Sequence, residues 1–224
     1  MAEEVFHHLD RMGVIDEDTV FNLEFSNLRQ GGPSPKFDNH GIFQGVGQDE
    51  YDFIEQYFPE GLTSHGKSYL YRQFDLTRDV LQNQDKYLDS NHIGMLLATP
   101  RLNQDWVKEI VFEGVRRDEH PKQNSRFQSV FGARNIEELQ DWVNSVGANV
   151  GEGDIYKIRT NEHFVADASL LDFPSGFSGT QTELAEILKQ QADRYWSGES
   201  TETPVYEVLL EPPVNVGEFV ERIS

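Results

Sequence analysis

The sequence predicts a single α+β domain with a largely antiparallel or mixed sheet, and three observations lead to this fold class. Short runs of β-forming residues occur toward both ends of the chain, and amphipathic helical patterns lie between them. The two kinds of segment do not alternate as regular strand–helix–strand units. The 224 residues, 37% of them hydrophobic, are enough for one sizeable core. We therefore expect one domain over residues 1–224.

The first half of the chain mixes a strand, an irregular stretch and two helices. Residues 5–9 are apolar-rich and run into a turn at Gly13, which predicts an opening strand. Glycines and prolines without any helical period predict an irregular arm or loop at about residues 22–48. Residues 49–58 predict a short helix that Pro59 stops, and residues 103–117 a long helix with a buried apolar stripe. A turn-rich segment is expected at residues 58–66.

The second half of the chain predicts four or five short strands around two capped helices. Residues 125–131 predict a strand that Gly132 breaks. Asn135 with Glu138, and Thr180 with Glu183, have the spacing of capping boxes, so we expect a helix after each. Further short strands are expected at residues 155–159, 163–166, 205–210 and 214–220.

Acidic residues dominate the charged side chains. The chain has 39 acidic and 19 basic residues, a formal charge of −20 that is spread along the sequence. Dispersed carboxylates suit a halophilic, salt-adapted surface, because self-repulsion is screened at high salt. Alternatively, the carboxylates mimic the phosphates of nucleic acid and capture a basic partner, but a mimic concentrates its charge on one face. We favour salt adaptation, and direct nucleic-acid binding is disfavoured because it needs a clustered basic surface.

Several classes of protein and site are excluded or disfavoured by what the sequence lacks. It has no cysteine, which excludes disulfides, thiolate nucleophiles and cysteine metal sites. The seven histidines show no zinc-site spacing, so no metal is predicted. No apolar run approaches the length of a membrane span, and the first residues are acidic where a signal peptide would be basic. We expect a cytoplasmic protein without membrane contact.

Two segments carry candidate chemistry. Ser125, Arg126 and Ser129 precede a capped helix, where hydroxyls, a guanidinium and the positive helix end could meet a phosphate-bearing ligand. Glu207 is the only charge in an apolar strand, so its carboxylate must face solvent, a cleft or a partner. The alternative is that these are ordinary surface or turn residues.

Five segments resemble an uncharacterised microbial family, a domain of unknown function that in turn resembles the ADP-ribosyltransferase superfamily. They are Phe6-His7-His8-Leu9-Asp10-Arg11, the run from Phe58 to Gly66, Ser125-Arg126-Phe127-Gln128-Ser129-Val130-Phe131, Tyr195-Trp196-Ser197-Gly198-Glu199 and Tyr206-Glu207-Val208-Leu209-Leu210. The resemblance implies a pair of split β-sheets that frame a nicotinamide-dinucleotide cleft, with flanking helices. NAD would then be the substrate.

The resemblance also implies roles for individual residues. Glu207 would stabilise the oxocarbenium-like charge on the ribose as nicotinamide leaves, and His8 would form a hydrogen bond with a ribose hydroxyl. These two are the expected catalytic residues. The expected cofactor-binding residues are His8, Arg11, Ser125, Arg126, Phe127, Ser129 and Tyr195.

The sequence departs from the transferase patterns at two places. Those patterns are Arg, Ser-Thr-Ser and Glu-x-Glu, or His, Tyr and Glu. Val205 stands two residues before Glu207, which argues against arginine as the acceptor, and Phe127 stands where a tyrosine is wanted, so Phe127 or Tyr195 would stack on nicotinamide. The expected function is NAD cleavage with transfer of ADP-ribose to an unknown acceptor, for example a protein, or to water. Two alternatives stay open: a catalytically inactive nucleotide- or protein-binding module, and an acidic decoy for a basic protein.

Overall fold

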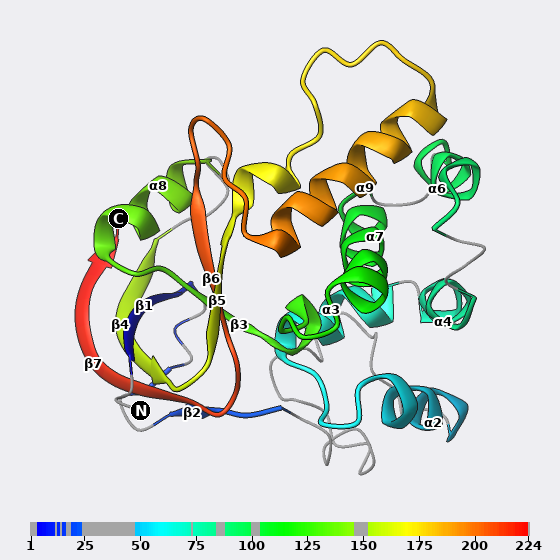
Figure 1. The fold of residues 1–224 in the computed structure, drawn as a ribbon. Helices are drawn as coiled ribbons and strands as arrows, with labels where there is room; N and C mark the ends of the chain where they lie inside the picture. The colour runs from blue at the N-terminus through cyan, green and yellow to red at the C-terminus, as the bar shows by residue number, and fades with distance from the viewer. Residues whose placement is uncertain are drawn as a thin grey trace.

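Two antiparallel β-sheets lie on one side of the molecule and most of the helices on the other (Figure 1). The expected mixture of helices with antiparallel sheets is confirmed. The computed structural model describes residues 4–11, 13, 15–16, 19–23, 48–72, 74–83, 88–99, 104–145 and 152–223. The expected arm at residues 22–48 lies almost wholly outside the described residues.

The first sheet joins the two ends of the chain. Its strand order is β1 (Glu4–Asp10), β4 (Gly153–Thr160), β7 (Val214–Ile223) and β2 (Val20–Phe21), and each neighbouring pair is antiparallel. The strands expected at residues 5–9, 155–159 and 214–220 are confirmed, and the structure extends the last one to Ile223.

The second sheet has the order β3 (Val130–Gly132), β6 (Tyr206–Leu210) and β5 (His163–Asp167). An isolated bridge joins it to the first sheet, where β1 runs beside the end of β3. There the N–H of His7 donates to the carbonyl of Ala133 at 2.8 Å, and the N–H of Ala133 donates back at 2.9 Å. Apolar side chains from both sheets, among them Phe6, Ile158 and Val208, form a common core. We call the place where β1 meets β3 the seam.

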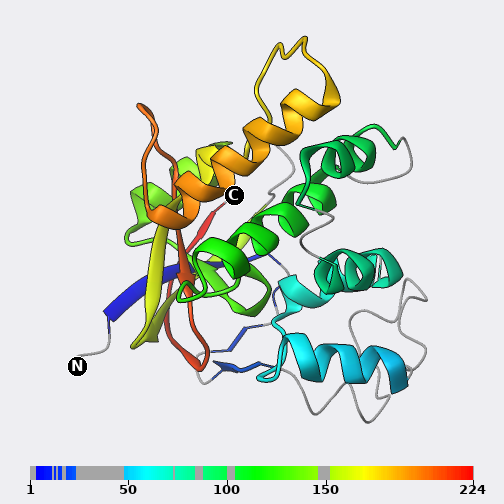
Figure 2. The same cartoon turned by 45° about the vertical axis from the view of Figure 1, so that its right-hand side comes forward.

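A second and larger core lies among the helices. They are α2 (Gln48–Tyr57), α3 (Ser64–Arg72), α4 (Phe74–Gln82), α6 (Ser90–Leu97), α7 (Gln104–Glu119) and α9 (Gln181–Ser197). Figure 2 shows α7 between α9 and the smaller helices. The expected buried stripe of α7, including Trp106 and Ile110, is confirmed, and the capping box of Thr180 and Glu183 starts α9 as predicted. None of the described helices is long and apolar enough to cross a membrane.

One helix, α8 (Ile136–Ser145), packs against the sheets instead. Its Leu139 lies in a small cluster with Leu9 and Ile155. The Asn135 side chain accepts a hydrogen bond from the N–H of Glu138 at 2.9 Å, which confirms the predicted cap. The Glu138 carboxylate completes no capping box and instead accepts hydrogen bonds from Arg134.

The strand expected over residues 125–131 is wrong. The chain forms a short 3₁₀ turn, η2 (Arg126–Gln128), and β3 begins only at Val130. The Ser125 hydroxyl accepts a hydrogen bond from the N–H of Phe127 at 3.2 Å, and the Ser129 hydroxyl donates to the Ser125 carbonyl at 2.8 Å. These local side-chain bonds compete with strand pairing and close the turn.

Candidate functional site

The buried side chain of Arg126 lies at the centre of a polar cluster. Its Nε and Nη2 donate to the two carboxylate oxygens of Glu109 at 2.9 and 3.0 Å. Its Nη1 donates to the Tyr195 hydroxyl at 2.8 Å and to the Glu207 carboxylate. Because α7, α9 and β6 supply these three partners, one guanidinium in η2 connects three elements that are far apart in the sequence.

Charge pairing explains how these groups can be buried. Burial acts to lower the pKa of Arg126, but the carboxylates of Glu109 and Glu207 outweigh it and raise the pKa well above its ordinary value. Burial likewise acts to raise the pKa of Glu109, but Arg126 and His65 hold it below its ordinary value. Arg126 is therefore a cation and Glu109 an anion at neutral pH.

Tyr195 is the neutral member of the cluster. Burial and the adjacent Glu207 carboxylate raise its pKa well above the ordinary value, although Arg126 acts in the opposite direction. The hydroxyl thus keeps its hydrogen and donates it to Glu207 at 2.6 Å. Glu207 is only 3% exposed, and its carboxylate accepts hydrogen bonds from both Arg126 and Tyr195.

Two further rings border the cluster. The Phe131 ring centroid lies 4.9 Å from the guanidinium carbon of Arg126 and 4.7 Å from the ring centroid of His65. His65, on the first turn of α3, has its Nε2 3.6 Å from a Glu109 oxygen. Thr63 anchors this turn to η2, since its N–H and its hydroxyl both donate to the Phe127 carbonyl, at 3.0 and 3.1 Å.

Helix α7 supplies a second carboxylate, that of Glu113, one turn after Glu109. Glu113 accepts hydrogen bonds from Arg116, from Arg117 at 2.7 Å and from the Ser125 hydroxyl at 2.8 Å. Burial acts to raise the pKa of Glu113, but the two arginines hold it below its ordinary value. The extended cluster thus contains three carboxylates, Glu109, Glu113 and Glu207, and three guanidiniums, Arg116, Arg117 and Arg126. Their formal charges cancel.

His8 lies at the seam between the two sheets. Its Nδ1 is 2.7 Å from the Phe131 carbonyl oxygen, and because a carbonyl only accepts, Nδ1 must carry the hydrogen. Burial lowers the pKa of His8, and the charge of Arg11 adds to this, while the Phe131 carbonyl and Asp10 act in the opposite direction. The neutral ring then has a lone pair on Nε2 that can accept a hydrogen bond. Arg11 itself is exposed just after β1.

The expected site residues therefore divide into three groups. Arg126, Tyr195 and Glu207 are in direct contact. His8 reaches them through Phe131, and no hydrogen bond or ion pair among the described residues joins His8 to Glu207 directly. Ser125, Ser129 and Phe127 position η2: Ser125 caps it, the Ser129 hydroxyl donates a hydrogen bond to the Ser125 carbonyl, and Phe127 is fully buried against Phe58 in the helical core. Arg11 belongs to none of these groups, because it lies exposed just after β1.

Strand pairing brings the seam and the cluster side by side. Gly132 of β3 pairs with Val208 of β6, so one further step of this register sets Ala133 opposite Glu207. Ala133 also pairs with His7 of β1. Since neighbouring strands lie about 4.8 Å apart, the backbones of His7 and Glu207 are separated by about 10 Å. This register puts His7, not His8, in line with Ala133 and Glu207. Because side chains alternate along a strand, the His8 side chain leaves β1 on the opposite face and reaches the Phe131 carbonyl across the seam.

Sequence reasoning missed three residues of this arrangement: His65, Glu109 and Phe131. The signal for Glu109 was available, because Glu109 and Glu113 lie one turn apart on a helix and the three residues between them are all apolar. Two acids on a buried helix face require cations nearby. Nothing local marks His65 or Phe131, which join the cluster only through the packing of α3 and β3.

Comparison with known families gives one finding that covers most of the chain. The model of a family described as "Protein of unknown function (DUF2441)" matches residues 43–222. The matched segment includes every member of the Arg126 cluster, whereas His8 precedes it. A search of curated proteins finds no match.

Proposed function

The chain belongs to the family described as "Protein of unknown function (DUF2441)", and from its seam we propose an ADP-ribosyltransferase-like enzyme that cleaves NAD. The observation that carries this proposal is the placement of His8, Phe131 and Glu207 on three neighbouring strands. The transferase pattern of His, Tyr and Glu that the sequence resembles asks for an imidazole, an aromatic ring and a carboxylate. Here Phe131 supplies the ring.

The two small sheets support the proposal at the level of the fold. They meet edge to edge at His7 and Ala133, with α8 packed against them and the other helices gathered on one side (Figure 1). This agrees with the split sheets that the resemblance implies. We propose that the dinucleotide binds along the seam, where Nε2 of His8 accepts a hydrogen bond from a ribose hydroxyl and the half-buried Phe131 ring stacks on nicotinamide.

Glu207 would supply the negative charge that the transition state needs. As the bond between the ribose C1′ and the nicotinamide nitrogen breaks, its electron pair leaves with neutral nicotinamide and positive charge develops on the ribose. The carboxylate stabilises that charge. An acceptor oxygen then bonds to C1′ and releases its proton to water.

The hydrogen bonds of Arg126 allow Glu207 to take this role. Arg126 contacts Glu207 through Nη1 alone, whereas Glu109 accepts from both Nε and Nη2. If Glu207 turns to a bound ribose, Arg126 keeps its two hydrogen bonds to Glu109 and is not left as an unpaired buried charge. The Tyr195 hydroxyl remains close enough to Arg126 to keep the guanidinium in place.

Replacing Glu207 by glutamine tests the proposal. Glu207→Gln removes the charge but keeps the shape of the side chain. The rate at which nicotinamide is released from NAD should therefore fall by at least about 100-fold, while the affinity for NAD changes little. Nicotinamide release and the mass of any ADP-ribosylated protein give the activity, and calorimetry gives the affinity. Glu202→Gln, at an exposed position just before β6, is the matched control. Equal turnover in the wild type and Glu207→Gln would overturn the proposal.

A second candidate is a nucleotide-binding module without catalysis, and the burial of Glu207 favours it. A carboxylate that is 3% exposed and already paired with Arg126 resembles a structural group as much as a catalytic one. If the second candidate is right, NAD or ADP-ribose binds the wild type and His8→Ala weakens this binding. No nicotinamide is released. If calorimetry detects neither NAD nor ADP-ribose binding, both candidates fail.

A further inference from the structure

Glu119, His120 and Asp193 form a cluster on the helical side, away from the seam. His120 Nε2 lies 2.8 Å from an Asp193 oxygen, and one ligand atom from each of the three residues lies within 4.8 Å of the other two. We propose that this cluster is a binding site for a divalent transition-metal ion of the zinc type. The proposal is independent of the proposed function.

The donor atoms suit such an ion. One imidazole nitrogen with two carboxylate oxygens is a ligand set that borderline cations such as Zn²⁺ accept. Zn²⁺ binds these atoms at about 2.0–2.2 Å, so ligand atoms that share the ion stand about 3–3.5 Å apart. The distance from His120 to Asp193 is already close to this value. Glu119 is exposed and has a long side chain, so a change of rotamer can close the remaining gap.

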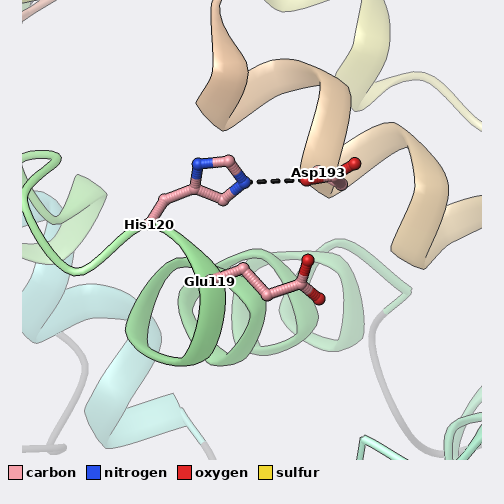
Figure 3. Close-up of side chains that lie close together, drawn as sticks. All are labelled: Glu119, His120 and Asp193. Atoms are coloured by element: carbon pink, nitrogen blue, oxygen red, sulfur yellow. Dashed lines mark hydrogen bonds and ion pairs between the residues drawn. The ribbon is translucent and has the colours of Figure 1, made fainter.

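The surroundings of the cluster also favour a cation. Figure 3 shows the side chains of Glu119 and His120 extending toward the face of α9 that carries Asp193. Glu119 is the last residue of α7, where the unpaired carbonyl ends of a helix attract positive charge. Among the described residues, no lysine or arginine forms an ion pair with Glu119 or Asp193. The His120 and Asp193 side chains are 19% and 54% exposed, which leaves room for water as a further ligand.

A metal ion here would join the two helices that hold Arg126. Asp193 lies two residues before Tyr195 on α9, and Glu119 ends the helix that carries Glu109, with His120 directly after it. The ion would therefore stabilise the native packing of α7 against α9. Sequence spacing predicts no metal site because His120 and Asp193 are 73 residues apart, and only the fold brings them together.

Zn²⁺ alone is the probe that tests the site. The full chain is treated with EDTA, dialysed and titrated with Zn²⁺ by calorimetry, and its melting temperature is followed by circular dichroism. We expect one saturable site and, at about 100 times Kd, a rise in Tm of about 5–10 °C. Mg²⁺, which prefers oxygen ligands in an octahedral arrangement, should give a much smaller rise.

Two variants of the cluster and one matched control make the test specific. His120→Ala should weaken Zn²⁺ binding at least about 10-fold and abolish the rise in Tm, and Asp193→Asn should do so without a change of size. His92→Ala is the control, because His92 faces Asp89 at 3.4 Å in a pair that belongs to no group of three possible metal ligands within the described part of the chain. It should bind like the wild type. The proposal is overturned if wild type shows no saturable site, or if His120→Ala and Asp193→Asn, both folded, bind Zn²⁺ as tightly as His92→Ala.

Discussion

Gly66 shows how closely α3 approaches the turn that carries Arg126. A Cβ atom at this position would lie 2.1 Å from the Phe127 carbonyl oxygen, a distance at which the backbone must move. The same carbonyl accepts both hydrogen bonds from Thr63, so it is fixed in place. A glycine is required here for close approach of two backbones, and this contact holds His65 near Glu109.

We expect Gly66→Ala to destabilise the protein by about 1–3 kcal/mol, the cost typical of overpacking. In an open helix the same change would stabilise by about 1 kcal/mol, so the sign of the effect reports the clash. Urea unfolding followed by circular dichroism measures the difference. Gly114→Ala on α7 is the matched control, because its Cβ would meet the Leu88 side chain, with a terminal methyl at 2.7 Å, and no backbone atom among its three nearest neighbours. A Gly66→Ala variant as stable as Gly114→Ala would contradict the contact.

At this scale the sequence indicates which residues are unusual better than it indicates their partners. Glu207 stands out as the one charge in an apolar strand, which means that it must face solvent, a cleft or a partner. It faces partners, Arg126 and Tyr195. Those partners lie 81 and 12 residues away, and no local pattern specifies such pairs. The position of Phe127 could not be predicted either, because only the fold shows that its ring is in the core.

The longer or capped helices and most of the short strands follow from the sequence, whereas the helices α4 and α6 and the turn η2 do not. The repeated apolar stripes of α7, α8 and α9 span two or more turns, and their caps are local, so they could be predicted. The helices α4 and α6 have nine and eight residues, fewer than the window in which a helical period can be recognised. In η2 the hydroxyls of Ser125 and Ser129 decided the conformation against the β propensity of their neighbours.

Asp167 illustrates how one side chain fixes several elements. Asp167 is the last residue of β5. Its carboxylate accepts hydrogen bonds from the N–H groups of Ser169, Thr201 and Val205 and from the Thr201 hydroxyl, at 2.7 to 3.0 Å. Burial acts to raise the pKa of Asp167, but these donors lower it below the ordinary value. The carboxylate thereby ties the start of β6 to the end of β5.

We expect Asp167→Asn to cost about 2 kcal/mol of unfolding free energy near neutral pH, because an amide cannot accept all of these bonds. The folded pKa is depressed, so the ionised carboxylate contributes fully above its unfolded pKa of about 3.9, and the contribution is lost as pH falls through the folded pKa. The stability difference between wild type and variant should therefore shrink below about pH 4. Urea unfolding across this range measures it, and a difference that stays constant with pH would contradict the assignment.

Across the whole molecule, balanced charge inside is combined with unbalanced charge outside. The three carboxylates and three guanidiniums of the extended Arg126 cluster cancel, so they add nothing to the formal charge of −20. The excess of acid must therefore lie elsewhere in the chain. Self-repulsion among solvent-facing carboxylates opposes the compact state, whereas buried pairs are screened little by salt.

Salt should therefore stabilise this protein. Raising NaCl from about 0.1 M to about 1 M shortens the Debye length from about 10 Å to about 3 Å, so repulsion between surface carboxylates weakens and Tm should rise by several degrees. A triple variant, Asp118→Asn, Asp141→Asn and Glu202→Gln, removes three exposed charges on separate elements. It should melt higher than the wild type at low salt and gain less from added NaCl. Differential scanning calorimetry at both salt concentrations measures the effect. A wild-type Tm that is constant or falls with salt would argue against salt adaptation and leave capture of a basic partner as the use of the acidic surface.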